Sequence, residues 1–88
     1  MNINPVRESY DGTGSAVYFV TKLIREIFFS NDSETTMYLS IISTSGTVSI
    51  KILPGDYMEE SFPEFNQLQI TADPNQAWRL ILRGGQIT

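Results

Sequence analysis

The residues best suited to chemistry are carboxylates, because the 88-residue chain contains no histidine and no cysteine. Catalytic sets that pair a serine or cysteine nucleophile with a histidine base are therefore excluded. The remaining enzymatic route is a pair of carboxyl groups in a deep cleft that raises the pKa of one of them. The candidates are Asp32, Asp56, Glu59, Glu60 and Glu64. A domain of this size rarely forms such a cleft, so we expect a protein that is not an enzyme.

The same acidic side chains offer oxygen ligands for a metal ion. Residues 31–34 and 56–60 contain carboxylates of the kind that calcium accepts in flexible geometry. Neither segment has the Asp-x-Asp-x-Asp-Gly spacing of a dedicated calcium loop. Solvated acids that keep the surface soluble are the simpler interpretation. We expect no metal site and no cofactor, and calcium at the acidic loops is left open.

Exposed aromatic side chains are candidates for binding a sugar. Trp78 alternates in phase with Leu80 and Leu82, which predicts that it lies in the core. Tyr38 and Tyr57 are the better candidates for exposed contacts, and tyrosine has both a flat apolar ring and a polar hydroxyl. A glycan-binding face that uses Tyr38 and Tyr57 is therefore an alternative function.

Charge and hydropathy exclude other partners. The formal net charge is −4 and the pI is about 4.5, so the chain has no dense basic patch for a phosphate backbone. The first residues lack the basic start and the apolar run of a signal peptide. The apolar runs at 16–20 and 27–29 are far too short to span a membrane. We expect no nucleic acid and no membrane as partners, and a cytoplasmic protein unless a virion carries it.

The clearest structural signal is a hairpin over residues 36–53. Apolar residues alternate with polar ones on both sides of the turn Ser43-Thr44-Ser45-Gly46. Placing Ile42 opposite Thr47 brings six apolar residues to one face: Met37, Leu39, Ile41, Val48, Ile50 and Ile52. A shift of one residue would separate the two apolar sets, so the pattern also predicts the register.

Other segments complete an antiparallel pattern. Residues 16–30 fit an amphipathic helix by spacing, but their Val, Ile, Phe and Tyr content favours one long strand, or two that join near Thr21-Lys22. The sequence Leu53-Pro54-Gly55-Asp56 predicts a type II turn. Residues 57–65 are expected to form a connection or a short edge strand, since Pro63 excludes a central position in a sheet.

The last third of the chain predicts a second hairpin. Residues 67–71 and 77–83 alternate, which would pair Ile70 with Trp78 and Leu68 with Leu80, and Gly84-Gly85 would end the last strand. Residues 1–14 are expected to form an extended N-terminal arm, either frayed or ordered against a neighbouring subunit. The prediction is a single all-β domain over 15–88, a small antiparallel β-sandwich or barrel of the jelly-roll or immunoglobulin-like kind with about five to seven strands.

Surplus apolar residues predict a subunit interface. Val20, Ile24 and Phe28 lie on one side of the 16–30 strand, while the other side is also apolar. A strand of an isolated sandwich should have one polar side, so we expect copies of the chain to cover these residues. Arg79 and Arg83 could pair with acids of a neighbour, or form surface pairs within one copy that would add little stability.

The order of these features resembles small β-sandwich proteins from the virions of tailed phages. The residues behind the resemblance are the lead-in at 11–15, the two turns at 43–46 and 53–56, and the closing strand at 77–85. Beyond the lead-in, the similarity covers residues 15–85. It implies a structural protein without enzymatic activity, such as a capsid decoration, head or tail component. It also implies self-association and contacts with other virion proteins. The pattern is also similar to accessory sandwich modules of carbohydrate-active proteins.

Overall fold

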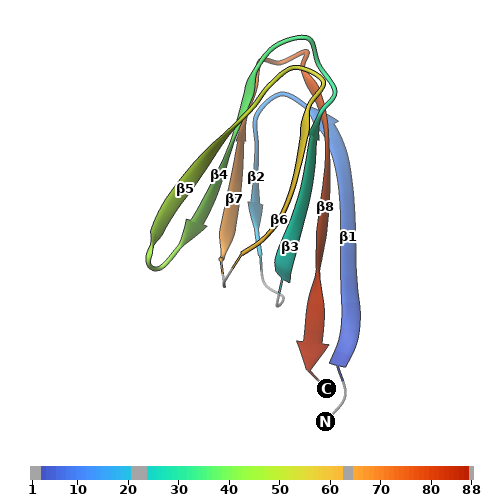
Figure 1. Ribbon diagram of the computed structural model, residues 1–88, viewed down its shortest axis with the longest axis vertical. Coiled ribbons are helices and arrows are strands. Elements are labelled where there is room, and N and C mark those ends of the chain that lie inside the picture. The colour runs from blue at the N-terminus through green and yellow to red at the C-terminus, as the bar shows by residue number, and fades with distance from the viewer. Residues whose placement is uncertain (1–2, 21–23, 63–64, 88) are drawn as a thin grey trace.

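The computed structural model describes residues 3–20, 24–62 and 65–87, and the regular secondary structure in these ranges is β-strand. It comprises eight strands: β1 (Ile3–Thr13), β2 (Ala16–Phe19), β3 (Ile24–Asn31), β4 (Met37–Ser43), β5 (Gly46–Ile52), β6 (Tyr57–Ser61), β7 (Gln67–Thr71) and β8 (Ala77–Ile87). They form two four-stranded antiparallel sheets, β1-β8-β3-β6 and β2-β7-β4-β5 (Figure 1). This arrangement is a jelly roll and confirms the predicted all-β sandwich, although its eight strands exceed the predicted five to seven.

The core lies between the two sheets. Alternate residues of each strand face inward, as the two-residue period of a strand requires. The buried apolar side chains come from five strands and the segment before β7: Ile24, Ile27, Phe29, Met37, Leu39, Ile41, Ile52, Phe65, Leu68, Ile70, Trp78, Leu80 and Leu82. The indole nitrogen of Trp78 donates a hydrogen bond to the carbonyl of Gly14 at 2.8 Å, which satisfies its polar atom in the core.

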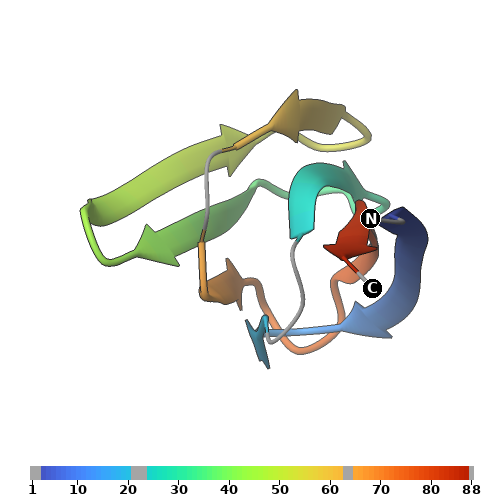
Figure 2. The same ribbon diagram turned by 90° about the horizontal axis from the view of Figure 1, so that it is seen from below.

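The β4–β5 hairpin has the predicted register. Ile41 pairs with Val48, Leu39 with Ile50 and Met37 with Ile52. The burial of the six apolar residues is uneven, however, because Met37 and Leu39 are fully buried whereas Val48 is 52% exposed. Figure 2 shows the reason: the hairpin, in green, projects sideways, so the tip has no strand of the other sheet over it.

Residues 16–30 contain two strands and not one long strand, in agreement with the second of the two alternatives predicted for this segment. The strands β2 and β3 belong to different sheets, and the junction predicted near Thr21-Lys22 lies outside the described residues. A β-bulge between Ile24 and Glu26 adds one residue to β3. Ile24 and Ile27 are both buried although three positions separate them, because the extra residue resets the alternation.

The two shorter predictions around β6 are confirmed. Gly55 has a φ of 71°, and the amide of Asp56 donates to the carbonyl of Leu53 at 3.0 Å, as in a type II turn. The strand β6 pairs with β3 and lies at the edge of its sheet.

The predicted hairpin between 67–71 and 77–83 is wrong. Both strands exist, but β7 pairs with β2 and β4, whereas β8 pairs with β1 and β3 in the other sheet. Ile70 therefore pairs with Leu39, and Trp78 with Gly12 and Asn31. Two alternating strands joined by a short loop can either pair within one sheet or lie in the two facing sheets of a sandwich. Here the loop between β7 and β8 connects the two sheets.

The ends of the chain also differ from the expectation. The segment 1–14, expected as an arm, contains β1, which pairs with β8 from Thr13–Ala77 to Ile3–Ile87. For the same reason β8 does not end at Gly84-Gly85, since β1 continues the ladder beside it. Figure 1 shows this two-stranded ribbon extending past the other strands to the end where both termini lie.

Candidate assembly surface

The predicted carboxylate candidates do not form a common site. Glu59 and Glu60 are neighbours on β6, so their side chains point to opposite faces. Asp56 accepts a hydrogen bond from the amide of Tyr57 at 2.9 Å, and Glu64 lies outside the described residues. Within the described part of the chain, no three Asp, Glu, His or Cys residues are grouped so that they could hold a metal ion.

Asp32 has a structural environment. Its carboxylate accepts a hydrogen bond from Arg79 Nε at 2.6 Å and another from the hydroxyl of Ser30 at 2.7 Å. The hydrogen bond from Arg79 lowers the pKa of Asp32 below its ordinary value, against a smaller opposing effect of burial. A carboxyl held ionised by an arginine is unsuited to act as a general acid.

The two arginines predicted at an interface both have partners within the same copy. Arg79 pairs with Asp32, and Arg83 pairs with Glu59 at 3.2 Å. This is the surface-pair arrangement that the sequence left as the alternative. The pairing of these arginines with acids of a neighbouring subunit remains a prediction.

The three apolar residues predicted at an interface have different positions. Ile24 is 2% exposed and belongs to the core, so almost none of its surface is available to a neighbouring copy. Val20 is half-buried against the core. Phe28 is half-buried on the outer side of β3, where its ring lies 5.7 Å from the ring of Tyr57.

The two tyrosines predicted to contact a ligand are exposed but lie on opposite sides of the molecule. Tyr38 pairs with Lys51 and Thr71 on the outer face of the β2-β7-β4-β5 sheet. Tyr57 belongs to β6 in the other sheet and packs against Phe28. One sugar could not contact both rings.

Sequence reasoning missed a difference in charge between the two outer faces. The outward positions of β2, β7, β4 and β5 contain no acid and a single base, Lys51. We call these positions the acid-free face: Val17, Phe19, Tyr38, Ser40, Ile42, Thr47, Ser49, Lys51, Gln67, Gln69 and Thr71. The outward positions of β1, β8, β3 and β6 carry both signs of charge: Arg7, Asp11, Glu26, Glu59, Arg79 and Arg83.

The acid-free face also carries exposed apolar side chains. Phe19 is 74% exposed and Val17 is 49% exposed, and both come from the edge strand β2. Pairing places Gln67 between Phe19 and Ile42, and Gln69 between Val17 and Ser40. A signal was present in the sequence, because 12–25, 35–55 and 65–72 contain no acid although the chain has ten.

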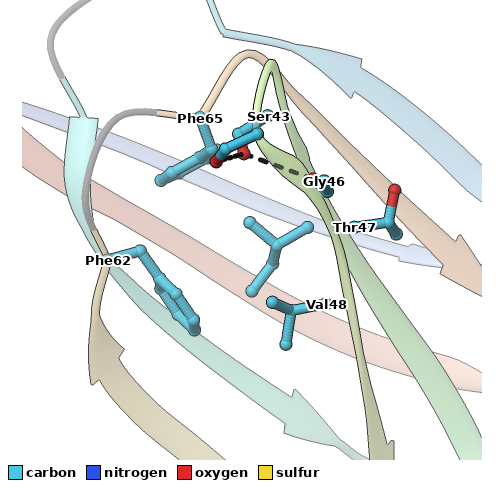
Figure 3. Close-up of a pocket in the computed structure, with 8 residues that line it drawn as sticks. Ser43, Gly46, Thr47, Val48, Phe62 and Phe65 are labelled. Carbon is cyan, nitrogen blue, oxygen red and sulfur yellow. Dashed lines mark hydrogen bonds between the residues drawn. The ribbon is translucent and has the colours of Figure 1, made fainter.

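A hollow lies beside the tip of the β4–β5 hairpin. It has a volume of about 230 Å³, with Phe62 and Phe65 on one side and Val48 and the turn on the other (Figure 3). Ile41, which pairs with Val48, also lines it. The hydroxyl of Ser43 donates to the carbonyl of Gly46 at 3.2 Å and holds the turn together. The hollow is the open end of the core, where the apolar side of β5 lacks a covering strand.

Comparisons with known proteins support the fold. No protein-family model and no curated protein matches the sequence. A solved structure described as "Bacillus endospore appendages form a novel family of disulfide-linked pili" superposes with a TM-score of 0.71 at 16% identity, over 97% of this chain and 89% of that chain. Another, "Crystal structure of PirA", has a TM-score of 0.48 at 10% identity, over 89% of this chain and 93% of that chain. The first likeness shows a shared fold. In the described ranges there is no helix long and apolar enough to cross a membrane.

Proposed function

We propose that the protein is a structural subunit without enzymatic activity, whose copies assemble through the β2-β7-β4-β5 sheet. The observation that carries the proposal is the acid-free face, which exposes Val17, Phe19 and Tyr38. A chain with a net charge of −4 repels its own copies, and this repulsion is weakest where acids are absent. Exposed apolar groups on such a surface favour association.

The kind of assembly that we favour is a filament. The fold is shared with a structure described as forming pili, whereas nothing comparable supports the tailed-phage virion that the sequence resembled. The pili in that description are disulfide-linked, but this sequence contains no cysteine. The residues of this sequence therefore cannot form such disulfide links between copies.

The test is the association state of the purified protein. Sedimentation velocity at micromolar concentrations and above, with negative-stain electron microscopy, should show species larger than one copy. The variant Gln69→Glu adds one negative charge at the centre of the acid-free face with little change of shape, and it should weaken association. The matched control Asn75→Asp adds the same charge in an exposed loop and should have no effect.

Two results would overturn the proposal. One is a folded single copy at every concentration. The other is equal weakening by Gln69→Glu and Asn75→Asp, because that would show a dependence on total charge and not on this face.

A further inference from the structure

We propose that β2 of one copy pairs with the edge of β5 of a second copy, so that the two β2-β7-β4-β5 sheets become one continuous antiparallel sheet. This inference rests on the proposed function, because it specifies which surfaces of the subunit meet. Strand addition at a sheet edge supplies main-chain hydrogen bonds, while side chains at alternate positions supply specificity.

Charge distinguishes the edges of the two sheets. Exposed edge strands are usually protected from pairing by charged residues, proline or an inward-pointing charge. The edge strand β1 carries Pro5 and the charged residues Arg7, Glu8 and Asp11, and β6 carries Glu59 and Glu60. In contrast, β2 has no charged residue and β5 has one, Lys51. The edge strands β2 and β5 are therefore less protected from pairing than β1 and β6.

Strand direction allows the pairing to repeat. Each of the four strands is antiparallel to its neighbour, so β2 and β5 run in opposite directions at the two edges. A second copy in the same orientation can therefore place its β2 antiparallel to β5 of the first. That copy presents its own β5 to a third, and a contact of this head-to-tail kind builds either a ring or an open filament.

The side chains of the two strands match in direction. Val17 and Phe19 point outward, as do Thr47 and Ser49, while Tyr18 points inward, as does Val48. A register with Val17 opposite Ser49 keeps inward residues beside inward residues. It places Tyr18 next to Val48, which is 52% exposed in one copy and borders the hollow at the hairpin tip. Cross-strand neighbours of this kind stabilise a sheet.

Disulfide trapping tests the pairing directly, because the chain has no cysteine of its own. The variant Val17→Cys is mixed with Thr47→Cys, Ser49→Cys or Lys51→Cys and oxidised mildly, after circular dichroism has verified that each variant is folded. We expect a heterodimer on a non-reducing gel, strongest for Ser49→Cys and several-fold above the control mixture. The control joins Ser9→Cys on β1 with Ser61→Cys on β6, which are exposed positions on the protected edges.

The outcomes separate the two proposals. A heterodimer with any of the three β5 positions supports the pairing, and the strongest position reports its register. If the protein associates in solution but Val17→Cys links to none of them, this inference fails and the proposed function stands. Cross-linking of Ser49→Cys only to itself would indicate a two-fold β5–β5 contact and would also overturn the inference. A chain that stays a single copy overturns both proposals.

Discussion

Asn31 is the most deeply buried polar residue in the described part of the chain. Its side-chain nitrogen donates to the carbonyls of Thr35 at 2.8 Å, Ile52 at 3.1 Å and Leu53 at 3.2 Å, and the residue is fully buried. Its side-chain oxygen accepts hydrogen bonds from the amide of Ser33 at 3.0 Å and from the Ser33 hydroxyl at 2.7 Å. One amide therefore joins the end of β3, the following loop and the end of β5.

The substitution Asn31→Ala should lower the free energy of unfolding by about 2–3 kcal/mol, because it leaves buried carbonyl groups without a hydrogen-bond donor. Urea denaturation followed by Trp78 fluorescence measures the change. The matched control Asn75→Ala, in an exposed loop, should stay within about 0.5 kcal/mol of the wild type. Equal stability of the two variants would contradict a structural role for Asn31.

The pair of Asp32 and Arg79 predicts part of the acid sensitivity. The hydrogen bond from Arg79 lowers the pKa of Asp32 in the folded state, so the pair stabilises the protein above the ordinary carboxyl pKa of about 3.9. This stabilisation is lost as the pH falls below that value towards the lowered pKa. Arg79→Gln should therefore lose less free energy of unfolding than the wild type when the pH falls from about 6 to 3. Urea denaturation at several pH values measures this slope, and Lys51→Gln, which removes a charge elsewhere, should keep the wild-type slope.

At the scale of elements, the sequence predicted what depends on neighbours along the chain. The β4–β5 register follows from local alternation around one turn, and the 53–56 turn follows from Pro54 and Gly55. The assignment of β7 and β8 to different sheets depends on which strands pair with them. The alternation of apolar and polar residues is the same whether the two strands pair with each other or lie in different sheets. The pairing of β1 with β8 joins the two ends of the chain, so no local pattern could predict it.

The predicted interface shows the same limit for single residues. A strict two-residue period in 16–30 places Ile24 with Val20 and Phe28 and away from Ile27. The bulge between Ile24 and Glu26 turns Ile24 into the core instead. Bulges depend on the partner strand as much as on the bulged one, so the sequence of β3 alone could not reveal this one.

Ile24→Ala should therefore destabilise one copy and leave its contacts with other copies unchanged. We expect a loss of about 2–4 kcal/mol in the free energy of unfolding, the usual cost of removing a large buried aliphatic side chain. Leu53→Ala, at a position that is 51% exposed, is the control and should cost much less. Urea denaturation gives the stability and sedimentation velocity gives the association. An Ile24→Ala protein of wild-type stability that no longer associates would restore Ile24 to the interface.

At the scale of the whole molecule, the sandwich has two unlike sides. Three of the six bases, Arg7, Arg79 and Arg83, lie on the outer face of the β1-β8-β3-β6 sheet together with acids. The opposite side is the acid-free face. Mixed charges favour contact of the first side with water. The acid-free face instead has amide and hydroxyl groups between apolar side chains. The centres of protein interfaces are likewise depleted of charged residues.

This asymmetry predicts how salt should act on the assembly. Copies with a net charge of −4 repel one another, and salt shortens the range of that repulsion from about 30 Å at 0.01 M to about 3 Å at 1 M. If the acid-free face and the edge strands β2 and β5 hold the copies together, the contact has no pairs of opposite charge, so salt removes the repulsion without weakening the contact. Sedimentation velocity should then show larger species at high salt. If Arg79 and Arg83 bound acids of a neighbour, as the sequence suggested, salt would dissociate the copies. Dissociation by salt would therefore place the contact on the charged side of the molecule.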